Sequence, residues 1–180
     1  MRANILTAVL LILPLVSTAA EPAKSQLQFQ GQTFELAFAQ ANETAAINEY
    51  IPQGETLDRW KAMLAVRTFA GRRDYEPMAG NLVKALKQQN PLARAAIHTS
   101  ADGRRTMVDF VTWDVQQGIT EFNVFLYQLG PDGNSVIAQQ YAERAYGKEQ
   151  GLEFLHQLKD RRMKLLAAVG EFKFPAVAAQ

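Results

Sequence analysis

The sequence predicts a single α+β domain in which two helices pack on one curved, mainly antiparallel sheet. Two features of the chain lead to this fold class. Segments that alternate apolar and polar residues occur early in the chain and again in its middle, and a segment with the 3.6-residue period of a helix follows each group. The order is therefore strands, helix, strands, helix, which differs from the strict alternation that forces a parallel sheet. We expect both helices on the same face of the sheet.

The first strands are expected between residues 27 and 51. Apolar residues alternate with polar ones on both sides of Gly31, which is the pattern of a hairpin. These apolar residues are Leu27, Phe29, Phe34, Leu36 and Phe38. Residues 45–51 form a further strand, which a turn sequence with proline and glycine at residues 52–54 ends.

Residues 56–69 lead from this strand toward the first helix. Thr56 is placed to cap a short helical turn that runs to Trp60. We expect the side chain of Trp60 to fold back and anchor this turn against the sheet. Residues 61–69 then give another strand, and Gly71 ends it.

Two amphipathic helices are predicted, over residues 75–89 and 148–169. Asp74 is placed to cap the first helix with its side chain, and Gly170 ends the second. The apolar residues of each helix recur at spacings of three and four. They are Tyr75, Met78, Ala79, Leu82, Val83 and Leu86 in the first helix, and Leu152, Leu155, Leu158, Leu165, Leu166 and Val169 in the second.

Four strands are expected between the two helices. They cover residues 93–99, 106–115, 120–129 and 135–146. Turn sequences that contain glycine separate them, and Asp-Gly at residues 102–103 is a strong hairpin indicator. Both faces of the second of these strands carry apolar bulk, because Val108 and Phe110 alternate with Met107. We expect helices over one face, and a second layer or a ligand over the other.

Residues 1–20 are typical of a cleavable secretory signal peptide. Arg2 provides a positive charge, residues 5–16 are almost wholly apolar, and small residues follow up to Ala20. An uncleaved membrane anchor is the alternative, but about 12 apolar residues are too few for a hydrocarbon layer that needs about 20. We therefore expect cleavage between Ala20 and Glu21, and a secreted, periplasmic mature protein without a membrane span.

The chain is thereby divided into four parts. These are the signal peptide (1–20), a flexible leader (21–26), the single α+β domain (27–170) and a flexible tail (171–180).

The composition excludes several classes of function. The chain has 19 basic and 18 acidic residues, and loss of the signal peptide removes only Arg2, which leaves 18 of each. A neutral protein lacks the basic face that nucleic-acid binding requires. The chain has no cysteine, which excludes disulfides and a lipid-modified amino-terminal cysteine.

The histidines do not point to catalysis or to a metal. His98 and His156 are the only two, and neither has a second histidine at the spacing of a zinc site. His98, Ser100 and Asp102 have the residue types of a hydrolytic triad. Members this close together beside a hairpin turn do not converge easily on one substrate atom, so we reject that interpretation. No glycine-rich phosphate loop is present either, and we predict no catalytic residue, no metal and no cofactor.

Carboxylates are the remaining candidates for acid–base chemistry. Glu49 and Glu55 flank the turn at residues 52–54. Asp109 and Asp114 lie on one predicted strand, with their side chains on opposite faces. Such a pair acts as acid and base only if it converges in a cleft, and carboxylates that are solvated or ion-paired are the more frequent case.

Aromatic residues are concentrated in the predicted strands. Core packing accounts for most of them, and the alternative is that one face of the sheet presents them to an apolar pocket or to a partner. The candidate partner or ligand surface consists of Tyr50, Trp60, Trp113, Phe125 and Tyr127.

The segment from Asn48 to Trp60 contains a Glu-Tyr…Pro…Gly-Glu-Thr…Trp pattern. It resembles a segment of uncharacterised exported proteins of Gram-negative bacteria, in which the pattern precedes a strand and a helix. The order of elements is also similar to the PsbP/Mog1-like α+β architecture. The resemblance implies a periplasmic setting and a non-enzymatic role, and it supplies no catalytic residue.

Three hypotheses for the function follow. The first is a non-enzymatic periplasmic binding or accessory module that docks a protein partner or an envelope component through its sheet. The second is a carrier of a small apolar ligand, enclosed between the curved meander of the middle strands and the carboxy-terminal helix. The third is a hydrolase that uses carboxylates or His98.

The export hypothesis makes a direct prediction about the mature protein. When the full chain is expressed in a Gram-negative host, the periplasmic fraction is expected to contain a product that begins at Glu21. Amino-terminal sequencing or intact-mass measurement checks this. A product that keeps residues 1–20 and sediments with the membranes would contradict the prediction.

Overall fold

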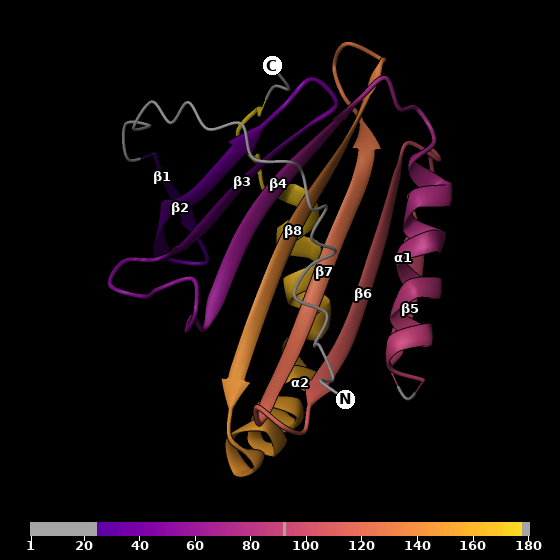
Figure 1. Ribbon diagram of the computed structural model, residues 1–180. Coiled ribbons are helices and arrows are strands. Elements are labelled where there is room, and N and C mark those ends of the chain that lie inside the picture. Colours follow the sequence, from indigo (N-terminus) through magenta and orange to yellow (C-terminus); the bar gives the residue numbers. More distant parts are fainter. Residues whose placement is uncertain (1–24, 92, 178–180) are drawn as a thin grey trace.

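Figure 1 shows a computed structural model that describes residues 25–91 and 93–177. In this part of the chain, eight strands form one open antiparallel sheet in the order β1-β2-β3-β4-β8-β7-β6-β5, accompanied by two helices. The strands are β1 (Gln26–Phe29), β2 (Gln32–Ala41), β3 (Ala45–Pro52), β4 (Ala62–Ala70), β5 (Arg94–Thr99), β6 (Arg105–Asp114), β7 (Ile119–Leu129) and β8 (Ser135–Tyr146). The helices are α1 (Tyr75–Gln89) and α2 (Lys148–Glu171). The predicted α+β class is confirmed.

The two helices lie on opposite faces of the sheet, so the prediction of a shared face is wrong. Figure 1 shows α2 behind the sheet and α1 on the other side, along the edge formed by β5. The reason lies in β7, whose apolar side chains alternate between two separate cores. Phe122 and Val124 pack with α2, whereas Phe125 and Tyr127 pack with α1. One helix cannot cover both sets.

The core under α2 is the larger of the two. Its buried side chains come from α2 and from strands β1, β2, β3, β4, β7 and β8. Phe34, Tyr50, Leu64 and Phe122 are among the largest of them and are all at most 1 % exposed. Full burial of an apolar side chain of this kind contributes about 1.5–3 kcal/mol, so this core is a main source of stability in a protein without disulfides.

The first turns of α2 depart from the predicted apolar stripe. Gly151 faces the sheet so closely that a Cβ atom there would lie 2.4 Å from the Thr120 hydroxyl oxygen. This approach fixes the rotation of the helix and directs two leucines of the predicted stripe toward solvent. Leu152 is 61 % exposed and Leu155 is 37 % exposed. The stripe is buried from Leu158 onward.

Residues after α2, expected to be a flexible tail, contact the α2 core as far as they are described. The ring of Phe172 lies 5.0 Å from that of Phe29, and Phe174 packs against Phe172 at 4.8 Å. The Thr68 hydroxyl donates a hydrogen bond to the carbonyl oxygen of Val177. The expected signal peptide lies outside the described residues, and so do residues 21–24 of the expected leader, while Gln26 already belongs to β1.

Two predicted caps take other roles. Thr56 begins no helical turn, because its backbone forms an isolated bridge with Arg59, and the Glu55 carboxylate closes the loop by accepting the Lys61 N–H at 2.7 Å. Asp74 occupies the position before α1, but its side chain forms no capping hydrogen bond with the helix. Its carboxylate instead accepts hydrogen bonds from Nε and Nη2 of Arg72. A charged partner competes successfully for a side chain that is otherwise suited to capping.

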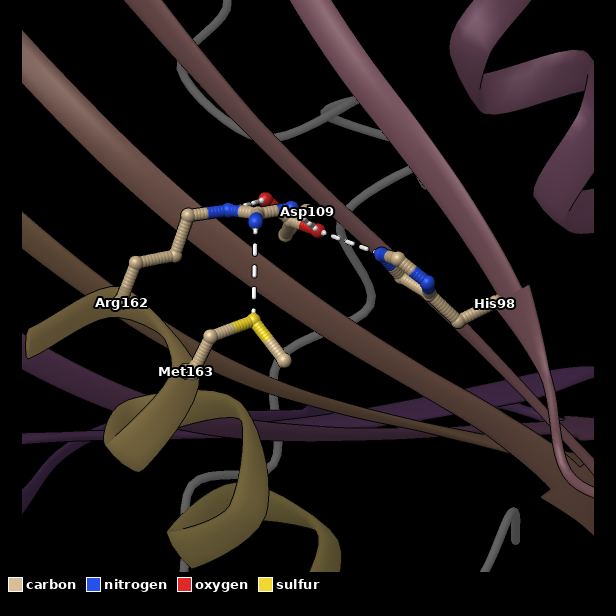
Figure 2. A network of polar contacts seen from close by, with 4 residues as sticks. All are labelled: His98, Asp109, Arg162 and Met163. Atoms are coloured by element: carbon tan, nitrogen blue, oxygen red, sulfur yellow. Dashed lines mark hydrogen bonds and ion pairs between the residues drawn. The ribbon is translucent and has the colours of Figure 1, made fainter. Parts of the chain in front are cut away.

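A cluster of polar side chains fastens α2 to β6 (Figure 2). Arg162 donates two hydrogen bonds of 2.7 Å to the carboxylate of Asp109, whose side chain is only 5 % exposed. His98, on β5, contacts the same carboxylate at 3.2 Å through Nε2. Met163 lies beside Arg162, with Sδ 3.7 Å from Nη1. Asp109 is therefore held as an ion-paired structural carboxylate.

None of the helices among residues 25–91 and 93–177 has both the length and the apolar character required to cross a membrane.

Loss of the Arg162 contact is expected to be costly because it leaves the buried Asp109 carboxylate with His98 as its one remaining side-chain contact among the described residues. The substitution Arg162→Met should lower the free energy of unfolding by about 1–3 kcal/mol in chemical denaturation at neutral pH. Arg72→Met is the matched control, since it removes an equally bidentate arginine from the exposed Asp74 and should cause no measurable loss. Equal stability of the two variants would contradict this account.

Candidate functional site

A groove of about 580 Å³ lies between α1 and the face of the sheet on which α1 packs. This volume falls within the range of roughly 300–1,000 Å³ that is usual for sites that bind small molecules. The groove extends from β2 and β3, across β4, β8 and β7, to the inner side of α1. It exists because α1 packs mainly over β5, β6 and β7, which leaves much of the same face of the neighbouring strands without a helix.

Most of the side chains that line the groove are apolar. The loop before β4 contributes Leu57 and Trp60, and α1 contributes Met78, Leu82 and Ala85. The apolar residues from the strands are Phe38, Ala45, Ala46, Ile47, Met63, Phe69, Phe125, Tyr127 and Ala138. Such a lining favours an apolar occupant over water.

Trp60 lines the groove and is fixed at its backbone. The hydroxyl of Tyr146 accepts a hydrogen bond from the Trp60 N–H at 3.0 Å and donates one to the Trp60 carbonyl at 2.7 Å. The indole packs with Ile51 and Met63 and is 4 % exposed. The expected anchor role of Trp60 is thus confirmed.

A row of hydrogen-bonded polar side chains runs through the apolar floor. Arg67 on β4 donates to Oε1 of Gln140 at 2.7 Å, and Gln140 donates to Oδ1 of Asn123 at 2.7 Å. Asn123 donates to Oε1 of Glu121, also at 2.7 Å. Arg144 donates to the second oxygen of Glu121 at 2.5 Å. The row joins three adjacent strands, β4, β8 and β7, by side-chain contacts.

The charges along this row are paired, so the groove as a whole carries no excess charge. The Glu121–Arg144 pair is almost fully buried, with 4 % and 8 % of the side chains exposed, and the guanidinium of Arg144 lies 3.9 Å from the centre of the Trp60 ring. The second pair is looser: Nη2 of Arg67 lies 3.3 Å from Oε1 of Glu49.

Burial dominates the electrostatics of the looser pair. It raises the pKa of Glu49 above its usual value, against the opposing effect of Arg67 and Arg144. It also lowers the pKa of Arg67, despite the attraction of Glu49. Both shifts have the same main cause, which is the removal of the two side chains from water.

The structure brings together three of the five residues predicted to form a partner or ligand surface. Trp60, Phe125 and Tyr127 line the groove. Tyr50 lies on the opposite face, 1 % exposed in the α2 core. Trp113 has the strand parity of Asp109 and so lies on the α2 face as well, half-buried.

The sequence analysis did not identify the polar row. Arg67, Glu121, Asn123 and Gln140 are buried polar residues of strands β4, β7 and β8. The signal that the sequence offers is a charged residue, Arg67, in the mostly apolar strand β4. Which residues pair cannot be inferred from that signal, since Arg67 and Gln140 are 73 positions apart.

The candidate catalytic residues do not converge. Ser100 donates its hydroxyl hydrogen to Asp102 at 2.6 Å, while His98 contacts Asp109 instead. Asp114, on the other face of β6 from Asp109, accepts the backbone N–H of Gln116 and orders the following turn. The described residues contain no group of three or more side chains able to hold a metal ion.

Comparison with known proteins places the chain in a family. None of the curated proteins matches it. A family model matches residues 22–174, which covers the whole described sheet and both helices. The chain therefore belongs to the uncharacterised family whose model spans residues 22–174.

Proposed function

We propose that this protein binds a small, largely apolar ligand in the groove between α1 and the sheet. The observation that carries the proposal is the groove itself: about 580 Å³, lined mostly by apolar side chains. Water gains little in such a space, so transfer of an apolar molecule into it is favourable by about 25 cal/mol for each Å² of apolar surface buried.

The polar row supports the same function because it is already organised. Gln140, Asn123 and Glu121 satisfy one another, so a ligand does not need to break their hydrogen bonds on entry. A floor that is fixed in advance spares the ligand part of the ordering cost of binding. Strands and a helix position the side chains that line the groove, except for Leu57 and Trp60, which lie in a loop.

We further propose that binding takes place in the periplasm after cleavage behind Ala20. The signal-peptide pattern of residues 1–20, in a chain without cysteine, supports this setting. The similarity to PsbP/Mog1-like proteins stays a prediction from the order of elements.

The other two hypotheses find less support in the geometry. Docking of a protein partner through the sheet stays a prediction, and crosslinking followed by pull-down from envelope extracts tests it. A hydrolase based on His98, Asp109 and Asp114 is disfavoured for two reasons. Arg162 binds both carboxylate oxygens of Asp109. Asp114 lies on the other face of the sheet.

A bulky residue at the groove is expected to abolish ligand binding. Ala85 lines the groove from α1 and is only half-buried, so Ala85→Trp fills the space without disturbing a closed core. Titration with a fluorescent naphthalene probe should show at least about a tenfold loss of affinity relative to the wild-type protein.

Ala167→Trp provides the matched control for this substitution. Ala167 is exposed on α2, on the opposite side of the sheet, so the same change of residue in a helix should leave the affinity within about twofold of wild type. Equal loss in both variants, or no loss in either, would contradict a site in the groove.

A further inference from the structure

The hydrogen-bonding capacity of Arg67 exceeds what the described residues use. Arg67 is 9 % exposed and lines the groove. Its guanidinium donates to Gln140 through Nη1 and to Glu49 through Nη2, and within the described part of the chain it has no further acceptor, so Nε and the remaining N–H hydrogens are available. A buried guanidinium with unused donors is costly unless another acceptor is bound.

The hydroxyl group of Tyr127 adds a second unused donor on the same floor. Tyr127 is 6 % exposed, lines the groove and makes no hydrogen bond with the residues that the structure describes. Burial raises the pKa of this hydroxyl, and the charge of Arg67 opposes the shift. The group therefore stays protonated and able to donate at any physiological pH.

The sheet register places these two donors on either side of a small residue. Ala138 on β8 pairs with Arg67 on β4 and with Tyr127 on β7, so the three residues share one rung of the sheet. Their side chains project from the same face, and Ala138 leaves the space between the two larger ones open to the groove. An acceptor group placed over Ala138 would lie between the side chains that carry these two donors.

We propose that the ligand of the groove is an amphiphile with a carboxylate at one end, which Arg67 and the Tyr127 hydroxyl bind over Ala138. The proposal rests on the function proposed above and specifies its ligand class. A carboxylate has the acceptor geometry that a guanidinium matches best, and the apolar lining accommodates the rest of the molecule.

Glu49 makes the binding of such an anion dependent on pH. The charged groups that line the groove around it are Arg67 on β4, Arg144 on β8 and Glu121 on β7, and no ionisable residue of α1 lines it. When Glu49 is ionised, it competes with the ligand for Arg67. An anion bound at Arg67 raises the pKa of Glu49, which burial has already raised, so binding takes up a proton. Affinity for a carboxylate must then increase as the pH falls.

Three probes with the same chain and different end groups separate the possible outcomes. Decanoate, decanol and decylamine are titrated into the wild-type protein by calorimetry at about pH 8 and about pH 6, where decanoate and decylamine keep their charges. We expect decanoate to bind at least about tenfold more tightly than decanol at the lower pH, and to weaken several-fold at the higher pH. Decanol should show no such dependence.

Each alternative result has one meaning. Equal affinity for decanoate and decanol would overturn the carboxylate proposal and leave the proposed function standing. Tightest binding of decylamine would also overturn it, because Glu49 would then be the determinant. Binding of none of the three would count against the proposed function itself.

Two conservative variants that preserve the size of the side chain test the assigned residues. Tyr127→Phe removes only the hydroxyl and should lower decanoate affinity several-fold, with decanol unaffected. Glu49→Gln removes the competing anion and should strengthen decanoate binding at about pH 8 and abolish its pH dependence. A Glu49→Gln protein with the wild-type pH dependence would overturn the coupling, and chemical denaturation checks that both variants are folded.

Discussion

The central constraint in this structure is that β7 carries large apolar side chains on both of its faces. Phe122, Val124 and Leu126 require cover on one side, and Phe125 and Tyr127 require it on the other. Eight strands about 4.8 Å apart make a sheet about 34 Å wide, whereas a helix is only about 10 Å wide. One helix on each face therefore covers only part of the sheet, with α1 mainly over β5, β6 and β7 and α2 mainly over β7 and β8.

The two faces deal with the remaining strands differently. On the α2 face, large side chains such as Phe34 and Tyr50 fill the space, and Phe172 and Phe174 extend the cover beyond the end of the helix. On the α1 face, no described segment extends the cover of the helix in this way. The strands from β2 to β8 border the groove there. The candidate site is thus a consequence of unequal cover on a two-sided sheet.

Buried polar residues on the groove floor are hard to explain by stability alone. Desolvation of two charges commonly offsets their attraction, so pairs such as Glu121–Arg144 contribute little net free energy compared with apolar residues of the same size. The Asp109–Arg162 pair has a different structural role from the groove pairs, because it connects a helix to the sheet. The groove row connects strands that backbone hydrogen bonds already join, which favours a role in ligand recognition.

Local sequence patterns predict most of the elements of this fold, because glycine turns and apolar periodicity are local properties. The helix at Tyr75–Gln89 is predicted at its observed bounds, and Gly118 and Gly133 adopt the positive φ angles of 65° and 62° that their turns require. Local sequence patterns do not predict a feature that depends on a residue far away in the chain. The rotation of α2 depends on Gly151 meeting Thr120, and the polar row depends on strand pairing between residues far apart in the chain. The opposite placement of the helices follows from the apolar side chains on both faces of β7, although that pattern alone does not reveal which helix covers which face.

Native mass spectrometry of the protein purified from its own host tests the central claim most directly. The account predicts a second species, heavier than the polypeptide by the mass of one small lipid-like molecule, that disappears on denaturation and is depleted when the groove is filled at Ala85. Detection of the bare polypeptide alone, under conditions gentle enough to preserve apolar complexes of a reference carrier, would contradict the claim that the groove is a ligand site.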